Sequence, residues 1–111
     1  LFSGIGAIEH ALHRLKLKTE IVFAGDIDPF VKKAYFANYE ISEDSWHDDI
    51  QEFSAKKYKY KVDLLIGGSP CQSFSMVGER AGLEDARGTL FYDFARIIDE
   101  SRPKVFIFEN V

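Results

Sequence analysis

Residues 62–68, Val-Asp-Leu-Leu-Ile-Gly-Gly, give the first clear indication of architecture in this chain. The apolar run at 62–66 ends in two glycines, which is typical of a strand buried on both faces of a parallel sheet. We expect another buried strand at 105–108 and, between the two, a helix over 90–101 that Thr89 caps. The apolar face of that helix contains Phe91, Phe94, Ala95 and Ile98. This order predicts a parallel pair of strands with a right-handed crossover.

The residues before this unit also alternate between helix and strand. A turn at 3–6 precedes a first helix, whose apolar residues recur at helical spacing: Ile8, Ala11, Leu12 and Leu15. Glu9 is expected to face solvent. A strand is expected at 20–24, and Pro29 is expected to open a helix that runs to about Asn38. Two weaker elements are expected next, a short strand at 46–50 and a helical turn at 50–57. The pattern predicts an α/β fold with a Rossmann-like, mostly parallel sheet.

The composition is that of one compact domain. The chain has 111 residues, 46% of them hydrophobic, which is enough for a single core and excludes a second domain. No apolar run approaches the roughly 20 residues that cross a bilayer, and the N-terminus lacks the layout of a secretory signal. We therefore expect a soluble, cytoplasmic protein without a membrane partner. Leu1 runs directly into a glycine turn and Val111 follows an apolar strand, so we expect a piece of a longer protein.

The charge pattern is not that of a self-sufficient nucleic-acid-binding protein. The formal net charge is -4, and the basic residues are scattered apart from one short cluster. That cluster consists of Lys56, Lys57, Lys59 and Lys61. Tyr58 and Tyr60 alternate with these lysines, a pattern that fits either stacking on bases or a solvated face, and we favour the solvated face.

A glycine turn and an aspartate point to a nucleoside ligand. Gly4 and Gly6 lie between a strand end and a helix start, where a ligand can approach the backbone and the free N–H groups of the helix. A dinucleotide fingerprint would have its third glycine where Glu9 stands, so NAD is disfavoured. Asp26 follows the expected second strand, where a carboxylate can bind ribose hydroxyls. The alternative is that Asp26 and Asp28 cap the next helix.

The next pair of acidic residues allows the same two interpretations. Asp49 and Ile50 end the expected third strand and would offer an acceptor and an apolar wall to adenine. Asp48 and Asp49 would otherwise only occupy a turn. A nucleoside cofactor without a pyrophosphate, such as AdoMet, fits these features best.

Cys71 is the strongest candidate for catalysis. It is the only cysteine, so it forms no intrachain disulfide and is structural, metal-bound or reactive. It follows a buried strand directly after Pro70, a position that favours a nucleophile. Glu109 ends the neighbouring strand and is expected at the same edge of the sheet, where it can share a proton with a bound base. His10 and His13 share a helix face but have no second ligand pair, so no metal is expected.

Four segments resemble, in order and approximate spacing, the conserved motifs of cytosine-C5 DNA methyltransferases. They lie at 1–7, 67–75 with its Pro-Cys-Gln core, 87–91 and 108–111. The resemblance implies a Rossmann-like AdoMet-dependent methyltransferase sheet, incomplete at both ends. It also implies that residues 1–111 are a partial AdoMet-binding and catalytic domain without the target-recognition domain. The reaction would transfer the methyl group of AdoMet to carbon 5 of a cytosine in double-stranded DNA, with a cysteine adduct at carbon 6 of a flipped base.

The resemblance also implies a role for individual residues. Cys71 would be the nucleophile, Glu109 the acid that holds the base and Arg87 a helper near it, while residues 72–88 would close on DNA. The implied cofactor site contains Phe2, Ser3, Gly4, Gly6, Asp26, Ile27, Asp49, Ile50, Pro70 and Leu90. Asp26 would hold the ribose of AdoMet, and Asp49 with Ile50 its adenine. The implied substrate site contains Pro70, Gln72, Ser73, Ser75 and Asn110.

Three positions depart from the family pattern. Ile27 stands where many relatives have an aromatic residue that stacks on adenine, Ala7 where a third small glycine is common, and Ser69 where proline is frequent. The alternatives are a tRNA cytosine-C5 methyltransferase and a subunit that binds AdoMet or assembles without catalysis. We expect negligible methylation by the isolated chain. The resemblance also implies that the parent protein acts in a prokaryotic-type restriction-modification context.

Overall fold

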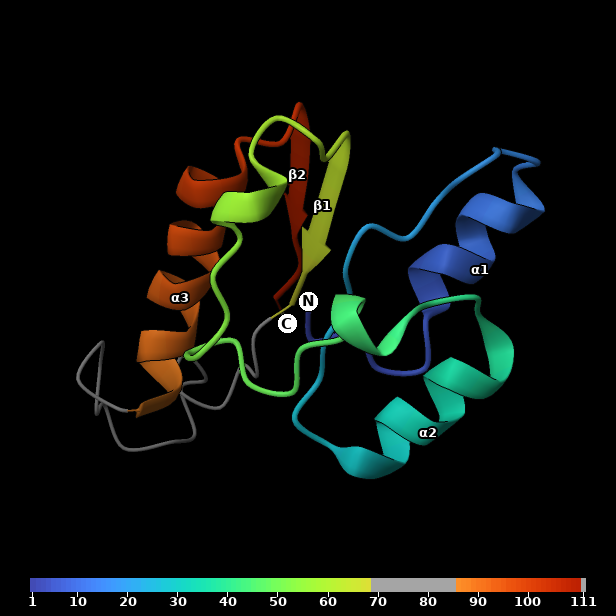
Figure 1. The fold of residues 1–111 in the computed structure, drawn as a ribbon, viewed down its shortest axis with the longest axis horizontal. Coiled ribbons are helices and arrows are strands. Elements are labelled where there is room, and N and C mark those ends of the chain that lie inside the picture. The colour runs from blue at the N-terminus through green and yellow to red at the C-terminus, as the bar shows by residue number, and fades with distance from the viewer. Residues whose placement is uncertain (69–85, 111) are drawn as a thin grey trace. The chain divides into compact units, whose positions relative to one another are not determined.

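The computed structural model of the chain describes residues 1–68 and 86–110, with the side chains of 86–89 excepted (Figure 1). The helices are α1 at Ala7–Arg14, α2 at Pro29–Asn38 and α3 at Ala86–Ser101, with short 3-10 helices η1 at Glu43–Ser45 and η2 at Lys56–Tyr58. The strands are β1 at Leu64–Gly67 and β2 at Val105–Phe108. These elements form two compact units, one containing Leu1 and Ile50–Val111 and the other Phe2–Asp49.

The first unit is the predicted strand-helix-strand arrangement. β1 pairs with β2 in parallel, in a register that runs from Leu64 opposite Val105 to Gly67 opposite Phe108. α3 packs on this pair through aromatic rings, since the ring of Phe108 lies 5.2 Å from Phe94 and 5.3 Å from Phe91. The parallel pair and its crossover helix are therefore confirmed.

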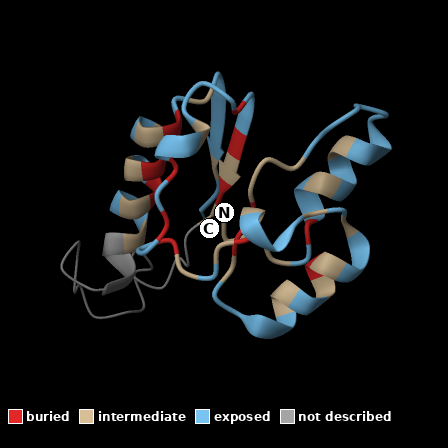
Figure 2. Ribbon diagram, in the orientation of Figure 1, coloured by how far each residue is buried: buried red, intermediate tan, exposed pale blue. Residues whose placement is uncertain are grey.

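Burial in this unit differs from the prediction. Only Leu65 and Gly67 of β1 are buried, and Val105, Phe106 and Ile107 of β2 are 50 to 56% exposed. α3 packs on the pair through Phe91 and Phe94, but most of β2 stays exposed, so burial on both faces is not observed (Figure 2).

The expected start and apolar face of α3 are also corrected. The helix begins at Ala86, so Thr89 lies inside it and does not cap it, because a helix extends readily once its first turn exists. Its fully buried residues are Phe94, Ile97 and Ser101. Ala95 and Phe91 are exposed and Ile98 is half-buried, so the buried face is rotated from the predicted one.

The second unit contains α1 and α2 but neither of its expected strands. Segments 20–24 and 46–50 meet only at one parallel bridge, between Ala24 and Trp46. A strand requires a ladder of several such pairs, and a single bridge does not make one. The buried core around the bridge is Ala24, Tyr35 and Trp46, packed by Ile21, Val31, Phe36, Tyr39 and Ile41.

Both helices of this unit are confirmed. Pro29 opens α2, and the side chain of Asp28 caps it by accepting the N–H of Phe30 at 2.8 Å. α1 has no buried residue, and Ile8 on its apolar stripe is 42% exposed. Glu9 is half-buried and accepts a hydrogen bond from the hydroxyl of Tyr35, so the expectation that it faces solvent is wrong.

Tyr39, the residue directly after α2, fixes the glycine turn that precedes α1. Its hydroxyl donates to the carbonyl of Gly6 at 2.6 Å, and a Cβ added to Gly6 would lie 2.3 Å from its ring. Gly6 also has φ 77°, in the left-handed region that favours glycine. Gly4 has φ 52°, but a Cβ added there would meet no atom within 4 Å.

The two glycines form a matched pair for a stability test. We expect Gly6→Ala to lower the free energy of unfolding by roughly 2 to 4 kcal/mol, since it combines backbone strain with an overpacked contact. Gly4→Ala should cost only the backbone term, about 1 kcal/mol. Chemical denaturation of the two variants measures the difference, and equal losses would show that Tyr39 does not constrain the turn.

No helix in the described part of the chain is both long enough and apolar enough to cross a membrane.

Candidate functional site

Hydrogen bonds join the glycine turn to the segment that ends in Asp26. The N–H of Ser3 donates to the carbonyl of Gly25 at 3.0 Å, and the N–H of Gly25 donates to Oγ of Ser3 at 3.1 Å. The N–H of Gly4 then donates to Oδ2 of Asp26 at 3.0 Å. Residues 22 positions apart in sequence are thereby held side by side. These bonds thus bring together four predicted cofactor residues: Ser3, Gly4, Gly6 and Asp26. Phe2, which is half-buried, adjoins them in sequence.

Asp26 has a fixed orientation with room for further hydrogen bonds. Its Oδ1 accepts the N–H of Asp28 at 3.1 Å, and its Oδ2 accepts that of Gly4. A carboxylate has about four acceptor sites, so two are left for donors such as ribose hydroxyls. Asp28, rather than Asp26, caps α2. The capping interpretation therefore applies to Asp28, while Asp26 stays a predicted ribose ligand.

Glu9 is held by a buried tyrosine of α2. Tyr35 is fully buried, and its hydroxyl donates to Oε1 of Glu9. Burial, together with the hydrogen bond to Glu9, raises the pKa of Tyr35 well above its usual value, so the hydroxyl remains a donor. The acid at the place of a third glycine therefore fastens α1 to α2.

Apolar side chains flank the aspartate. Ile27 follows Asp26 and is 77% exposed, and Ile5 follows Gly4 and is 74% exposed. An isoleucine side chain that is so exposed beside an oriented carboxylate is available for an apolar ring.

Asp48 has a structural role. Its Oδ1 accepts the indole N–H of Trp46 at 2.8 Å, and Nζ of Lys32 lies 3.7 Å from the same oxygen. Lys32 also pairs with Glu43 at 3.1 Å, and the hydrogen bond with Glu43 raises the pKa of Lys32. Asp49 is half-buried and Ile50 is buried. The turn interpretation therefore applies to Asp48, while Asp49 stays a predicted adenine ligand.

In the other unit, the carboxyl ends of β1 and β2 meet at Glu109 and Gly68. The N–H of Glu109 donates to the carbonyl of Gly67 at 2.9 Å, which extends the pairing by one residue. A Cβ added to Gly68 would lie 3.1 Å from Oε2 of Glu109, so the carboxylate lies against the Gly68 backbone. Pro70 and Cys71 follow Gly68 almost directly in sequence. Glu109 therefore lies beside Gly68, which Cys71 follows by three residues in the sequence.

The remaining predicted residues divide between described and undescribed positions. Pro70, Cys71, Gln72, Ser73 and Ser75 lie outside the described residues, and so does the side chain of Arg87. Leu90 is half-buried in α3, and Asn110 is exposed. The expected loop at 72–88 is corrected at its end, because residues 86–88 belong to α3.

The remaining charged clusters show no other site. His10 and His13 are exposed in α1, and no group of side chains in the described part of the chain has the composition of a metal site. The lysines of the basic cluster are exposed, with Lys57 over the ring of Tyr58 at 4.8 Å and Lys59 over that of Tyr60 at 5.4 Å. Both interpretations of this cluster stay predictions.

The sequence reasoning missed Tyr39 and Arg96. Each donates to backbone carbonyls far away in sequence, the first to Gly6 and the second to Ile50 and Phe53. The only sequence signal for Arg96 is its spacing on α3, with Asp93 three residues before it and Glu100 four residues after it.

The fold is similar to that of a solved methyltransferase. The crystal structure of S. pombe Dnmt2 methyltransferase matches with a TM-score of 0.70 and 27% sequence identity, covering 99% of this chain and 34% of that one. This likeness confirms the Rossmann-like methyltransferase fold class.

Curated relatives match over the whole chain. Orphan methyltransferase M.SPRI of Bacillus phage SPR is 45% identical over 111 residues, which are 25% of its own length. Type II methyltransferase M1.ScrFI of Lactococcus lactis subsp. cremoris is 45% identical over 27% of its length, and M.HpaII of Haemophilus parainfluenzae 42% over 30%. The chain spans about a quarter of the length of these relatives. The family model for C-5 cytosine-specific DNA methylases matches residues 1–111, so the chain belongs to this family.

Proposed function

We propose that this chain is the AdoMet-binding and catalytic part of an enzyme that methylates carbon 5 of cytosine in double-stranded DNA. The observation that carries the proposal is the position of Glu109 against Gly68, beside the segment with Pro-Cys-Gln. The target-recognition domain would lie outside residues 1–111, and the complete enzyme would act in the cytoplasm. The names of its type II relatives support a role in restriction-modification.

The described residues fit a nucleoside cofactor. Asp26 keeps two acceptor sites for the ribose hydroxyls of AdoMet, and the exposed Ile27 offers an apolar surface beside them. Asp49 would accept from the adenine amino group, and Ile50 would contact the ring. Pro70 and Leu90 are further proposed contacts. When bound, AdoMet supplies the methyl group that carbon 5 receives.

The residues of the chain would prepare the base for that transfer. The cytosine must leave the stack, since carbon 6 of a paired base is shielded from an approaching sulfur. The Cys71 thiolate would then form a bond to carbon 6, and Glu109 would stabilise the added negative charge through ring nitrogen N3. The charge makes carbon 5 nucleophilic. After methylation, a base removes the carbon 5 proton, and the electron pair expels Cys71 as thiolate.

We propose that five further residues hold the flipped base and its strand: Arg87, Gln72, Ser73, Ser75 and Asn110. Their roles come from the resemblance alone.

A mechanism-based trap tests the chemistry. With the complete protein, AdoMet and a duplex containing 5-fluorocytosine, we expect a denaturation-stable adduct at Cys71, because fluorine cannot leave as a cation. Cys71→Ala should form no adduct. Glu109→Gln should slow methylation of ordinary DNA by roughly 10²- to 10⁴-fold. Mass spectrometry locates the adduct, and methylation without any adduct would refute this mechanism.

A comparison of methyl transfer to duplex DNA and to tRNA by the complete protein identifies which nucleic acid is the substrate.

Ile27 provides a test of the cofactor site. We expect Ile27→Trp to tighten AdoMet binding by roughly 2- to 10-fold, because an aromatic ring adds a stacking contact with adenine. Ile27→Ala should weaken it. Leu17, also exposed and in the same unit, gives the control Leu17→Trp, which should leave the Kd unchanged. Calorimetric titration of the complete protein measures all three, and an unchanged Kd in both Ile27 variants would remove this residue from the site.

The isolated chain gives a further test. We expect residues 1–111 alone to transfer no measurable methyl group, because DNA contacts would come from elsewhere in the enzyme. Incorporation of labelled methyl into DNA measures this, and robust turnover would contradict it.

A further inference from the structure

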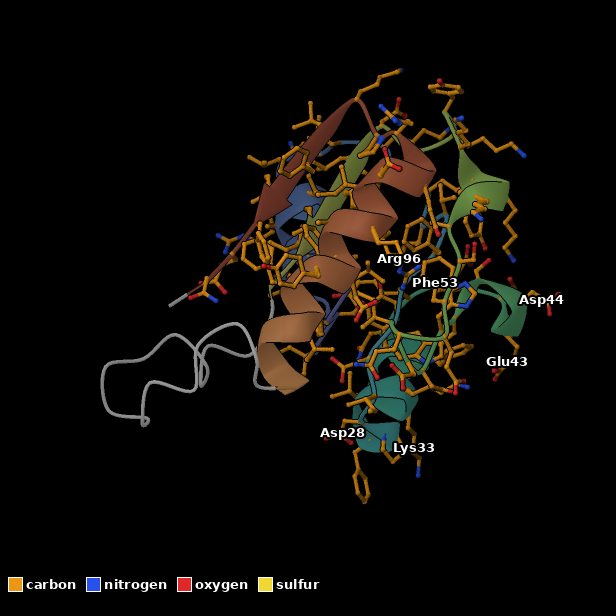
Figure 3. The ribbon with its side chains drawn as sticks, turned by 90° about the vertical axis from the view of Figure 1, so that its left-hand side faces the viewer. Asp28, Lys33, Glu43, Asp44, Phe53 and Arg96 are labelled. Atoms are coloured by element: carbon orange, nitrogen blue, oxygen red, sulfur yellow. The ribbon has the colours of Figure 1, made fainter. Side chains whose placement is uncertain are left out.

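Arg96 holds two backbone carbonyls with one guanidinium group. Its Nη1 donates to the carbonyl of Phe53 at 2.7 Å, and its Nη2 donates to the carbonyl of Ile50 at 2.7 Å. Both acceptors lie more than 40 positions earlier in the sequence. In Figure 3, Arg96 and Phe53 carry neighbouring labels, on α3 and on the segment beside it.

Two carboxylates of α3 orient the guanidinium. Oδ1 of Asp93 accepts from Nη2 at 3.1 Å and from Nε at 3.3 Å, and Oε1 of Glu100 lies 3.4 Å from Nη1. Glu100 also reaches the same segment, since its Oε2 accepts the N–H of Ala55 at 2.7 Å. All three nitrogens of Arg96 therefore have partners, and its charge is compensated where the side chain is only 33% exposed.

Half of the residues in the segment that these side chains hold are buried. Ile50, Phe53 and Ala55 are 8%, 5% and 0% exposed, whereas Gln51, Glu52 and Ser54 between them are exposed. Segment 50–55 contains no helix or strand, so its conformation depends on side-chain hydrogen bonds and packing. A planar guanidinium can fix two carbonyls at once, which the single ammonium of lysine cannot do in the same geometry.

We infer that Arg96 is a positioning residue for the adenine side of the cofactor site, acting through the backbone of Ile50. The inference rests on the proposed function, since Ile50 contacts AdoMet only if this chain binds it. Without Arg96, segment 50–53 would lose the two hydrogen bonds that Arg96 donates, and the carbonyl of Ile50 would be held less firmly. Loss of Arg96 would therefore weaken AdoMet binding and leave the rate of methyl transfer nearly unchanged.

The test uses the complete methyltransferase that contains this chain, with duplex DNA as substrate. Arg96→Gln should raise the KM for AdoMet about tenfold, while kcat at saturating AdoMet and the KM for DNA change less than about twofold. Arg96→Lys keeps the charge beside Asp93 and Glu100. Its KM for AdoMet should therefore lie between that of the unmodified enzyme and that of Arg96→Gln. Arg102→Gln is the matched control, because Arg102 pairs with Asp99 in an exposed position. It should change none of these constants.

A double-mutant cycle tests the route through Ile50. Ile50→Ala alone should weaken AdoMet binding, and adding Arg96→Gln to it should weaken binding by less than threefold more. Two results would overturn the inference: the full tenfold effect in the Ile50→Ala background, or a loss of kcat with an unchanged KM for AdoMet.

The outcomes also separate this inference from the proposed function. If the unmodified enzyme binds AdoMet and Ile50→Ala weakens binding while both Arg96 variants do not, only the positioning role of Arg96 is wrong. If the unmodified enzyme binds no AdoMet, the proposed function fails and the inference fails with it. Hydrogen exchange at residues 50–55, faster in Arg96→Gln than in Arg102→Gln, gives a second readout of the same anchor.

Discussion

The parallel pairing of β1 with β2 is the constraint on which the proposed chemistry depends. Parallel strands end at the same edge, and the register that sets Gly67 opposite Phe108 brings the residues after them together. The hydrogen bond from Glu109 to Gly67 continues that register into the loops. A slip of one residue would turn the Glu109 side chain to the other face of the sheet. The aromatic contacts of Phe91 and Phe94 with Phe108 stabilise the register from α3.

In the other unit, hydrogen bonds from backbone N–H groups to one carbonyl and two side chains hold the glycine turn. Ser3 and Gly25 exchange a pair of bonds, and Asp26 joins the same network through Gly4. Tyr39, directly after α2, fastens the turn at Gly6, and Tyr35 of α2 holds Glu9 of α1. The glycine turn is thus shaped mainly by side chains that a glycine motif does not contain.

The sequence predicted those elements whose signals are local. Pro29 after Asp28 located the start of α2, and two short apolar runs located β1 and β2, because caps and runs act over a few residues. The strands at 20–24 and 46–50 were wrong, since strand formation depends on a partner that local composition does not specify. Glu109 was predicted at the carboxyl end of its strand, and the structure has it there, directly after β2. Arg96 and Tyr39 were not predicted from the sequence. Both donate to backbone carbonyls, and every residue has one, so the sequence does not show which carbonyl accepts.

The two hydrogen bonds that Asp26 accepts have a kinetic consequence. A carboxylate oriented by the backbone of its own unit keeps its direction whether or not a nucleoside is present. If Asp26 binds ribose as proposed, exchange of spent for fresh cofactor between turnovers requires no rebuilding of this anchor. Association should then be fast, and the residence time of the cofactor should be set by the contacts to its base.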